Sequence, residues 1–399
     1  GLVGSEMCIR DSQCPGQAQW CHYRYERVRT WGQRMAPCLS PGNGATRLDR
    51  RASRQRCNTY TPLTSPVMLL PLAPYRAPFY LFNGHLQTLW PVWQTLRKPP
   101  INWPRERWET PDGDFIDVDC INHGSPGNPA IILFHGLEGN SQSHYARNLA
   151  TALARVGWTG YVPHFRGCSG ELNRLPRAYH SGDSQEIDWI LKRFKQREPQ
   201  RIFFAAGVSL GGNALMKWLG EQGAAAKEII HAAAAISPPM DVAACGTWLD
   251  QGTNRSVYTQ HFLRTMKAQS EARLVRFPGL FDAQRMRAAT TLREFDDTVT
   301  APLHGFKSVD DYWARASALG VLNGVKAPTL LLMPRNDPFL TDACYPQTCP
   351  ASVTLETPAT GGHVGFSGGH GTTKDMWLPS RIINFFAQSI GLTNTVADN

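Results

Sequence analysis

The sequence predicts an α/β fold, with a mostly parallel sheet covered by helices on both faces. Short apolar runs, typical of strands buried on both faces, alternate along the chain with amphipathic segments of helical period. Alternation of strands and helices favours parallel strands joined by helical crossovers. The chain has 399 residues, of which 42% are hydrophobic and 18% charged, so it can bury a sizeable core.

Seven strands are predicted from apolar runs and from alternation. Residues 130–134 (AIILF) form a continuous apolar run that ends at a His-Gly pair, whereas residues 115–120 alternate between apolar and polar. The other strands are expected at residues 160–164, 202–206, 232–236, 329–333 and 353–357.

Four helices are predicted between and after these strands. In residues 183–195 the apolar positions recur at i, i+3, i+4 and i+7, which places them on one helical face. Helices are also expected at residues 145–156, 210–219 and 377–389.

The stretch between residues 239 and 325 contains no convincing strand, only helical pieces at residues 256–269 and 310–319. The carboxyl edge of such sheets is where ligands bind. We therefore expect a helical cap over that edge at about residues 240–325.

Residues 1–67 differ in composition from the rest of the chain. They hold ten arginines and four acids, a net charge of +6, which leaves only +3 of the total +9 for residues 68–399. They show no sustained helical or strand period. We predict that residues 1–67 are disordered or a non-native extension, with Met68 at a natural start. Residues 68–399 are then the α/β domain.

Composition also excludes several classes of function. The body of the chain has no clustered basic stripe, so no nucleic-acid partner is expected. No apolar run reaches the ~18 residues of a spanning helix, and cysteines outside the first segment form no CxxC pair, which favours a cytoplasmic protein. The histidines form no HExxH motif and no cluster with metal spacing, so neither a metal nor a cofactor is expected.

The strongest chemical signal is Gly207-Val208-Ser209-Leu210-Gly211, a G-x-S-x-G motif between a predicted strand and a predicted helix. In that setting the glycines allow a sharp turn that holds a serine hydroxyl at the end of the sheet. We expect Ser209 to be a nucleophile.

A serine nucleophile needs a base and an acid that orients it, in the chain order Ser, Asp or Glu, His in this fold class. Asp337 follows the apolar strand at residues 329–333, and His363 follows the next one, in a glycine-rich loop. We predict that Ser209, Asp337 and His363 act together. The rivals are His370, Asp342 and, less well placed before the strand, Asp296 and Asp297.

Two backbone N–H groups are expected to stabilise a developing oxyanion. Leu210 begins the helix after the nucleophile, and Leu137 lies in the His135-Gly136-Leu137-Glu138-Gly139 loop after an early strand. The imidazole of His135 is expected to tie this loop down rather than to act as a base. Cys168 has no neighbouring base that would make it a reactive thiol.

Several segments together resemble the YheT-like branch of the α/β-hydrolase superfamily, carboxylesterase-like proteins related to abhydrolase-domain lipases and acyltransferases. The resemblance spans nearly all of residues 75–390. In that family the serine, aspartate and histidine of the matching motifs form the triad, which falls on Ser209, Asp337 and His363. The matching segments are NGHLQT (83–88), HGLEG (135–139), FRGCSG (165–170), YHSG (179–182), GVSLGGN (207–213), REFDD (293–297), NDPF (336–339), GGHVGF (361–366) and MWL (376–378).

The sequence thus predicts a serine hydrolase that cleaves carboxylic esters through an acyl-enzyme. The alternatives are acyl transfer to an alcohol and a non-catalytic binding protein of the same fold. A small ester or lipid is the expected partner. Peripheral membrane contact is not indicated by the sequence but stays open, as does the oligomeric state. Aromatic residues of the predicted cap, which are either pocket lining or cap core, are Trp248, Phe262, Phe277 and Phe281.

Overall fold

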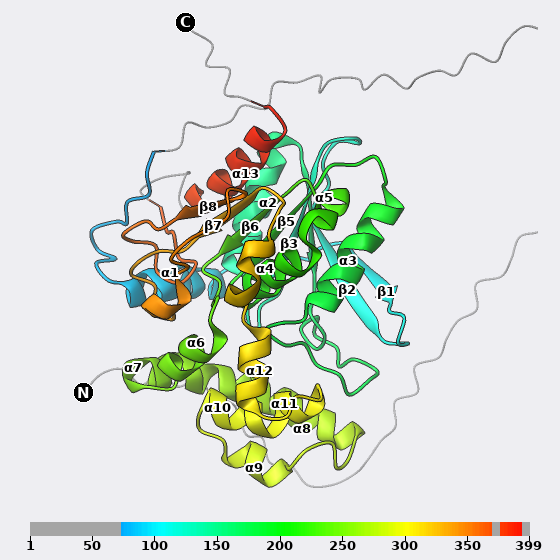
Figure 1. Ribbon diagram of the computed structural model, residues 1–399, viewed down its shortest axis with the longest axis vertical. Coiled ribbons are helices and arrows are strands. Elements are labelled where there is room, and N and C mark those ends of the chain that lie inside the picture. Colours follow the sequence, from blue (N-terminus) through cyan, green and yellow to red (C-terminus); the bar gives the residue numbers. More distant parts are fainter. Residues whose placement is uncertain (1–72, 369–375, 393–399) are drawn as a thin grey trace, which may run out of the picture. The chain divides into compact units, whose positions relative to one another are not determined.

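The computed structural model describes residues 73–368 and 376–392, and Figure 1 shows their arrangement. The predictions for residues 1–67 and for His370 concern positions outside the described residues.

A twisted sheet of eight strands forms the centre of the described part of the chain, in the order β1-β2-β4-β3-β5-β6-β7-β8. β2 pairs antiparallel with both β1 and β4, and all other neighbours are parallel. The predicted α/β fold class, with its mostly parallel sheet, is therefore confirmed. The strands are β1 (Arg105–Glu109), β2 (Phe115–Asn122), β3 (Ala130–Phe134), β4 (Thr159–Pro163), β5 (Phe203–Val208), β6 (Ala232–Ile236), β7 (Thr329–Leu332) and β8 (Val353–Glu356).

Each of the seven predicted strands is present within two residues of its expected bounds, but β1 was not predicted. Its sequence, RERWE, has four charged residues and buries only Trp108. The strand is held at the edge of the sheet by ion pairs to its neighbour, since Arg105 pairs with Asp119 and Arg107 with Asp117 across the strands. A strand stabilised by charge in this way carries little hydrophobic signal.

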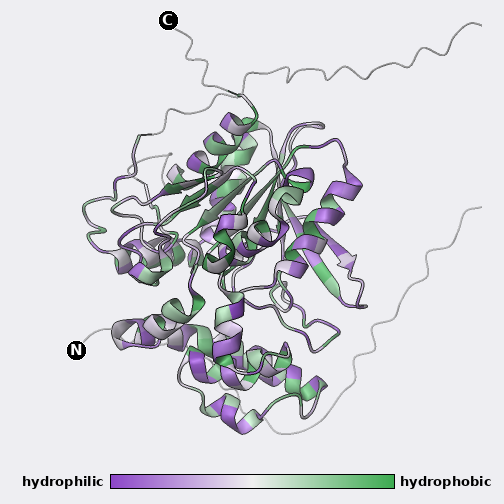
Figure 2. Ribbon diagram, in the orientation of Figure 1, coloured by the Kyte–Doolittle hydropathy of each residue, from purple (hydrophilic) through white to green (hydrophobic). Residues whose placement is uncertain are grey.

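Helices cover both faces of the sheet. On one face α3 and α4 pack against alternate strand residues such as Ile132 and Ala205, and on the other face α2 and α13 pack against their neighbours Ile131 and Phe204. Figure 2 shows the central strands as predominantly hydrophobic. Burial on both faces explains why these strands read as continuous apolar runs. The helices of this part are α1 (Gly84–Leu96), α2 (His144–Val156), α3 (Ser184–Arg197), α4 (Leu210–Gln222), α5 (Ala226–Ile229) and α13 (Trp377–Ser389).

Between β6 and β7 the chain forms helices without a strand, and these inserted helices gather at one end of the molecule in Figure 1. A π-helical turn, Arg255–Thr259, leads into the longest of them, so the predicted helix at residues 256–269 starts irregularly and continues further. The inserted helices are α6 (Val242–Leu249), α7 (Gly252–Asn254), α8 (Gln260–Arg276), α9 (Ala283–Ala288), α10 (Leu292–Phe295), α11 (Ala301–Leu303) and α12 (Val309–Ala316).

Sequence patterns also missed α1, which begins at the capping residue Asn83. Pro91 lies inside this helix, which breaks one backbone hydrogen bond and weakens the helical signal. Among the described residues, no helix is both long and apolar enough to span a bilayer.

Candidate active site

Ser209 lies alone between the end of β5 at Val208 and the start of α4 at Leu210. Its backbone has φ 52° and ψ −119°, a conformation that is strained for a residue with a side chain. The bend is held from both sides, because Ser209 N–H donates to Ile236 O at 2.8 Å and Ser209 O accepts from Asn213 N–H at 2.9 Å. The strained backbone conformation is thus found at Ser209, the residue that the sequence predicted to be a nucleophile.

The glycine at position 211 is required by close packing rather than by its own dihedral angles. A Cβ atom on Gly211 would lie 2.4 Å from His135 O and 2.6 Å from Phe134 O. Because only glycine fits there, the first turn of α4 can press against the end of β3. This contact brings Ser209 next to the loop that follows β3.

The structure brings Ser209, His363 and Asp337 together in one hydrogen-bonded chain. His363 Nε2 lies 2.8 Å from Ser209 Oγ, and His363 Nδ1 lies 2.9 Å from Asp337 Oδ2. An ionised carboxylate only accepts, so the proton of the neutral ring belongs on Nδ1 and Nε2 is left to accept from the serine hydroxyl. This is the protonation state that a general base requires.

Both partners of the serine are themselves held firmly. Asp337 is buried, and its Oδ1 accepts from Phe339 N–H at 2.9 Å. The ring of Phe339 stacks on the imidazole of His363 with centroids 3.9 Å apart, and His363 N–H donates to Thr88 Oγ1 at 2.8 Å. The imidazole is therefore fixed by bonds and packing on several sides.

The rival acids lie elsewhere. Asp342 is exposed in a short turn beyond Asp337. Asp296 accepts from Trp313 Nε1 at 2.8 Å and from Thr300 Oγ1 within the inserted helices, and Asp297 forms an ion pair with Arg285 there. Asp296 and Asp297 thus hold the inserted helices together, and Asp337 is the carboxylate that meets the histidine.

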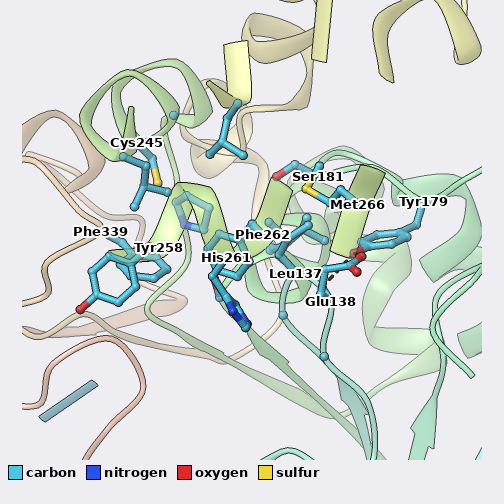
Figure 3. A pocket seen from close by; sticks show the side chains of 18 of the residues that line it. Leu137, Glu138, Tyr179, Ser181, Cys245, Tyr258, His261, Phe262, Met266 and Phe339 are labelled. Atoms are coloured by element: carbon cyan, nitrogen blue, oxygen red, sulfur yellow. Dashed lines mark hydrogen bonds between the residues drawn. The ribbon is translucent and has the colours of Figure 1, made fainter. Parts of the chain in front are cut away.

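The loop after β3 passes directly against the serine, since a Cβ on Gly136 would lie 3.3 Å from Ser209 Cβ. Two tyrosines fix the loop: Tyr145 Oη accepts from Gly136 N–H at 3.0 Å, and Tyr179 Oη accepts from Glu138 N–H at 2.9 Å. Tyr179 also donates to the Glu138 carboxylate, and the two side chains lie side by side in Figure 3. The sequence analysis assigned no role to either tyrosine hydroxyl.

The backbone N–H groups of Leu137 and Leu210 have no hydrogen-bond acceptor among the described residues. Within residues 73–368 and 376–392, neither N–H donates a hydrogen bond. Leu137 lies between two amides that are bonded to tyrosines, and Leu210 is the first residue of α4. Both amides therefore remain available beside Ser209, at the two positions that the sequence predicted.

His135 is fully buried and bonds through both ring nitrogens. Its Nδ1–H donates to Gly136 O at 2.8 Å, and its Nε2 accepts from Phe165 N–H at 3.0 Å. Burial, with His164 nearby, lowers its pKa to about 3. The ring therefore ties down the loop in its neutral form, as expected from the sequence.

This buried ring predicts acid lability. An ordinary histidine has a pKa near 6.5, so below about pH 6.5 the unfolded chain takes up a proton that folded His135 refuses down to about pH 3. In that window the free energy of unfolding of the wild type is expected to fall, relative to His135→Gln, by up to about 1.4 kcal/mol per pH unit. Denaturant unfolding at several pH values tests this, and a difference that does not vary with pH would refute it.

A cavity of about 650 Å³ lies between the carboxyl end of the sheet and the inserted helices. Ser209, His363, Leu137 and Leu210 all border it, and Figure 3 shows part of its wall. Of the four aromatic residues proposed from the sequence, only Phe262 lines it, whereas Trp248 donates from Nε1 to Pro338 O. Its mainly apolar wall includes Leu249, Tyr258, Met266, Leu292, Phe295, Val299 and Phe339.

Burial raises the pKa of the Cys168 thiol, which keeps it protonated. In the part of the chain that the structure describes, no three His, Cys, Asp or Glu side chains are grouped so that they could hold a metal ion.

Comparison with known proteins places this chain in a family. Residues 129–369 match the family described as the alpha/beta hydrolase fold. "Putative esterase YheT" of Escherichia coli (strain K12) is 37% identical over 307 residues, which cover 75% of this chain and 89% of that protein. "Phospholipase ABHD3" of Mus musculus is 29% identical over 303 residues, 73% of each chain. "Medium-chain fatty acid ethyl ester synthase/esterase 2" of Saccharomyces cerevisiae (strain ATCC 204508 / S288c) is 26% identical over 325 residues, which cover 72% of this chain and 68% of that protein.

A mostly parallel sheet with a serine on a strand–turn–helix bend at its carboxyl end defines the α/β-hydrolase class. The chain belongs to the alpha/beta hydrolase fold family, in the YheT-like branch that the sequence motifs indicated.

Proposed function

We propose that this protein is a serine hydrolase that cleaves carboxylic esters, with Ser209 as nucleophile, His363 as base and Asp337 as its orienting acid. The observation that carries the proposal is the hydrogen-bonded chain from Ser209 Oγ through His363 to Asp337 at the edge of a large apolar cavity. Relatives whose names describe esterases and a phospholipase support ester substrates.

In the first half of the reaction, His363 Nε2 takes the hydroxyl proton as Ser209 Oγ attacks the ester carbonyl carbon. The carbonyl oxygen gains negative charge and is stabilised by the N–H groups of Leu137 and Leu210. One such donor is worth about 2.7–4 kcal/mol in a measured protease. The intermediate collapses by breaking the bond to the alcohol oxygen, which takes the proton from His363 and leaves.

In the second half, water attacks the acyl-enzyme. His363 takes one proton of the water, the oxyanion forms again at the same two amides, and the ester bond to Ser209 Oγ breaks. Ser209 recovers its proton from His363 and the carboxylic acid leaves. Asp337 stays ionised throughout, and its charge compensates the imidazolium.

The inserted helices act in this proposal as a cap that closes the cavity over the serine. Their residues Phe262, Met266 and Leu292 supply apolar surface to the cavity that Ser209 borders. An acyl chain would bury apolar surface there, which favours lipid-like esters over small polar ones. A cytoplasmic location remains a prediction of the sequence.

Acyl transfer is a second candidate, because an alcohol can replace water in attacking the same acyl-enzyme. It is favoured by the name of the yeast relative, which describes both an ester synthase and an esterase. The ratio of new ester to free acid formed in the presence of added ethanol decides between the two activities.

Turnover of p-nitrophenyl esters from acetate to palmitate tests the proposal. Hydrolysis is expected at all chain lengths that the cavity admits, with kcat/KM rising from acetate toward medium chains as apolar contact increases. The full-length chain is the sample, and its circular dichroism spectrum shows that it is folded. A folded protein that turns over none of these esters would contradict ester hydrolysis.

A further inference from the structure

The outward face of α1 is apolar, the reverse of an ordinary surface helix. The buried residues of the helix are Gly84, Gln87, Thr88 and Pro91. The exposed face, together with Phe82 just before the helix, forms an apolar stripe with exposed fractions from 36% to 80%. We call it the α1 stripe, and its residues are Phe82, Leu86, Leu89, Val92, Trp93 and Leu96. A contiguous exposed patch of large apolar side chains marks an interaction site.

The inner face is polar because it anchors the loops of the active site. Gln87 Oε1 accepts from Gly361 N–H at 2.8 Å and from Asn336 Nδ2 at 3.0 Å, next to the two loops that carry Asp337 and His363. Thr88 accepts from the N–H of His363. These bonds explain why the inner face is polar. They give no reason for large apolar side chains on the outer face.

The cavity opens beside the α1 stripe. Leu89, Val92 and Leu96 are exposed, and each also borders the cavity that contains Ser209. Val257, 38% exposed, borders the cavity from the inserted helices. His85 Nδ1 meets Tyr258 Oη at 2.9 Å, which joins α1 to those helices. The apolar surface and the apolar cavity are therefore continuous.

The chain segment that carries the α1 stripe is positively charged. Residues 73–104 contain no Asp or Glu but include Arg76, Arg97 and Lys98. Arg97 lies over the ring of Trp93 at 3.4 Å from its centroid, and Trp93 stacks on Trp90. Tryptophan with flanking basic residues beside an apolar helical face is typical of segments that lie in the headgroup region of a membrane.

We propose that the α1 stripe seats the protein on the surface of an anionic membrane, so that a lipid ester passes its acyl chain from the bilayer into the cavity. The inference rests on the proposed ester hydrolysis and names the source of the substrate. The positive charge of this segment matches anionic lipid headgroups. The stripe is continuous with the cavity, which a route for a lipid acyl chain requires and the binding of a protein partner does not.

Sedimentation with vesicles tests this on the full-length chain. Wild type is expected to bind vesicles of phosphatidylcholine with phosphatidylglycerol, and to bind pure phosphatidylcholine more weakly. The variant Phe82→Ser/Leu86→Ser/Trp93→Ser is expected to lose about tenfold or more of this binding. None of these three side chains lines the cavity, so turnover of a water-soluble short ester is expected to stay unchanged. Val275→Ser is the matched control, since Val275 is 84% exposed on α8.

Vesicle binding is measured without turnover, so this test does not depend on the catalytic proposal. The Ser209→Ala variant is expected to bind vesicles as wild type does. The proposal is overturned if wild type does not sediment with anionic vesicles, or if the triple variant sediments equally well. It is also overturned if light scattering shows a wild-type dimer that the triple variant breaks, with no vesicle binding by either. In that case a second copy of the chain covers the stripe.

Discussion

Replacing Ser209 by alanine is expected to lower kcat for activated esters by about 10⁴-fold or more, because no other group can form the acyl-enzyme. The fold is expected to persist, since the serine hydroxyl bonds to His363 and the bend itself is held by backbone bonds. Initial rates with a p-nitrophenyl ester measure the loss.

The matched control is Ser380→Ala, the same change at a buried serine in helix α13, which does not line the cavity that contains Ser209. It is expected to retain most of the wild-type rate. Circular dichroism and thermal unfolding of both variants check that the structure is kept. A Ser209→Ala protein that still turns over esters in proportion to its concentration would refute the assignment of the nucleophile.

Asp337→Asn is expected to lower kcat by about 10⁴-fold at neutral pH, with a smaller effect on KM. An asparagine amide donates to His363 Nδ1, which moves the ring proton to Nε2. The base then points a proton at Ser209 Oγ and cannot accept one.

Asp342→Asn provides the comparison for this change, because it alters a rival acid five positions further along that the structure leaves exposed. Its activity is expected to stay near that of wild type. Equal losses in the two variants, or full activity of Asp337→Asn, would remove Asp337 from the proposed mechanism.

Much of this fold could be predicted from the sequence because its central strands are buried on both faces. Residues 130–134 and 232–236 are uniformly apolar. The helices at residues 210–222 and 377–389 bury apolar or small side chains on the faces that pack against the sheet. Local pattern and tertiary burial agree at these segments, so periodicity alone locates them.

β1 and α1 were not predicted, because in these two elements the local sequence pattern does not agree with burial in the fold. β1 is held by cross-strand pairs such as Arg105 with Asp119, and charge patterns of this kind are common in loops and helices as well. In α1 the usual relation between hydrophobicity and burial is inverted, and Pro91 interrupts it. A helix whose buried face is polar has no signature that a search for a hydrophobic core can find.

The candidate site was predictable where chemistry imposes a sequence motif. The bend at Ser209 needs glycine neighbours, and the order of serine, acid and histidine follows from the order of the strands. The roles of the groups that position the site could not be predicted in this way, although Gln87 and Tyr179 lie in the family-matching segments NGHLQT and YHSG. Tyr145, Tyr179 and Gln87 act through hydrogen bonds to the loops after β3 and before His363, and only the folded chain shows these contacts.

The central claim is that Ser209 is an activated nucleophile, and covalent labelling tests it most directly. The folded full-length protein is treated with a fluorophosphonate, and the adduct is located by intact-mass and peptide mass spectrometry. One adduct per chain on the peptide that contains Ser209, absent from Ser209→Ala, is the predicted result. No adduct on the folded wild type, or an adduct that maps to a different residue, would contradict the claim and favour a binding protein or another nucleophile.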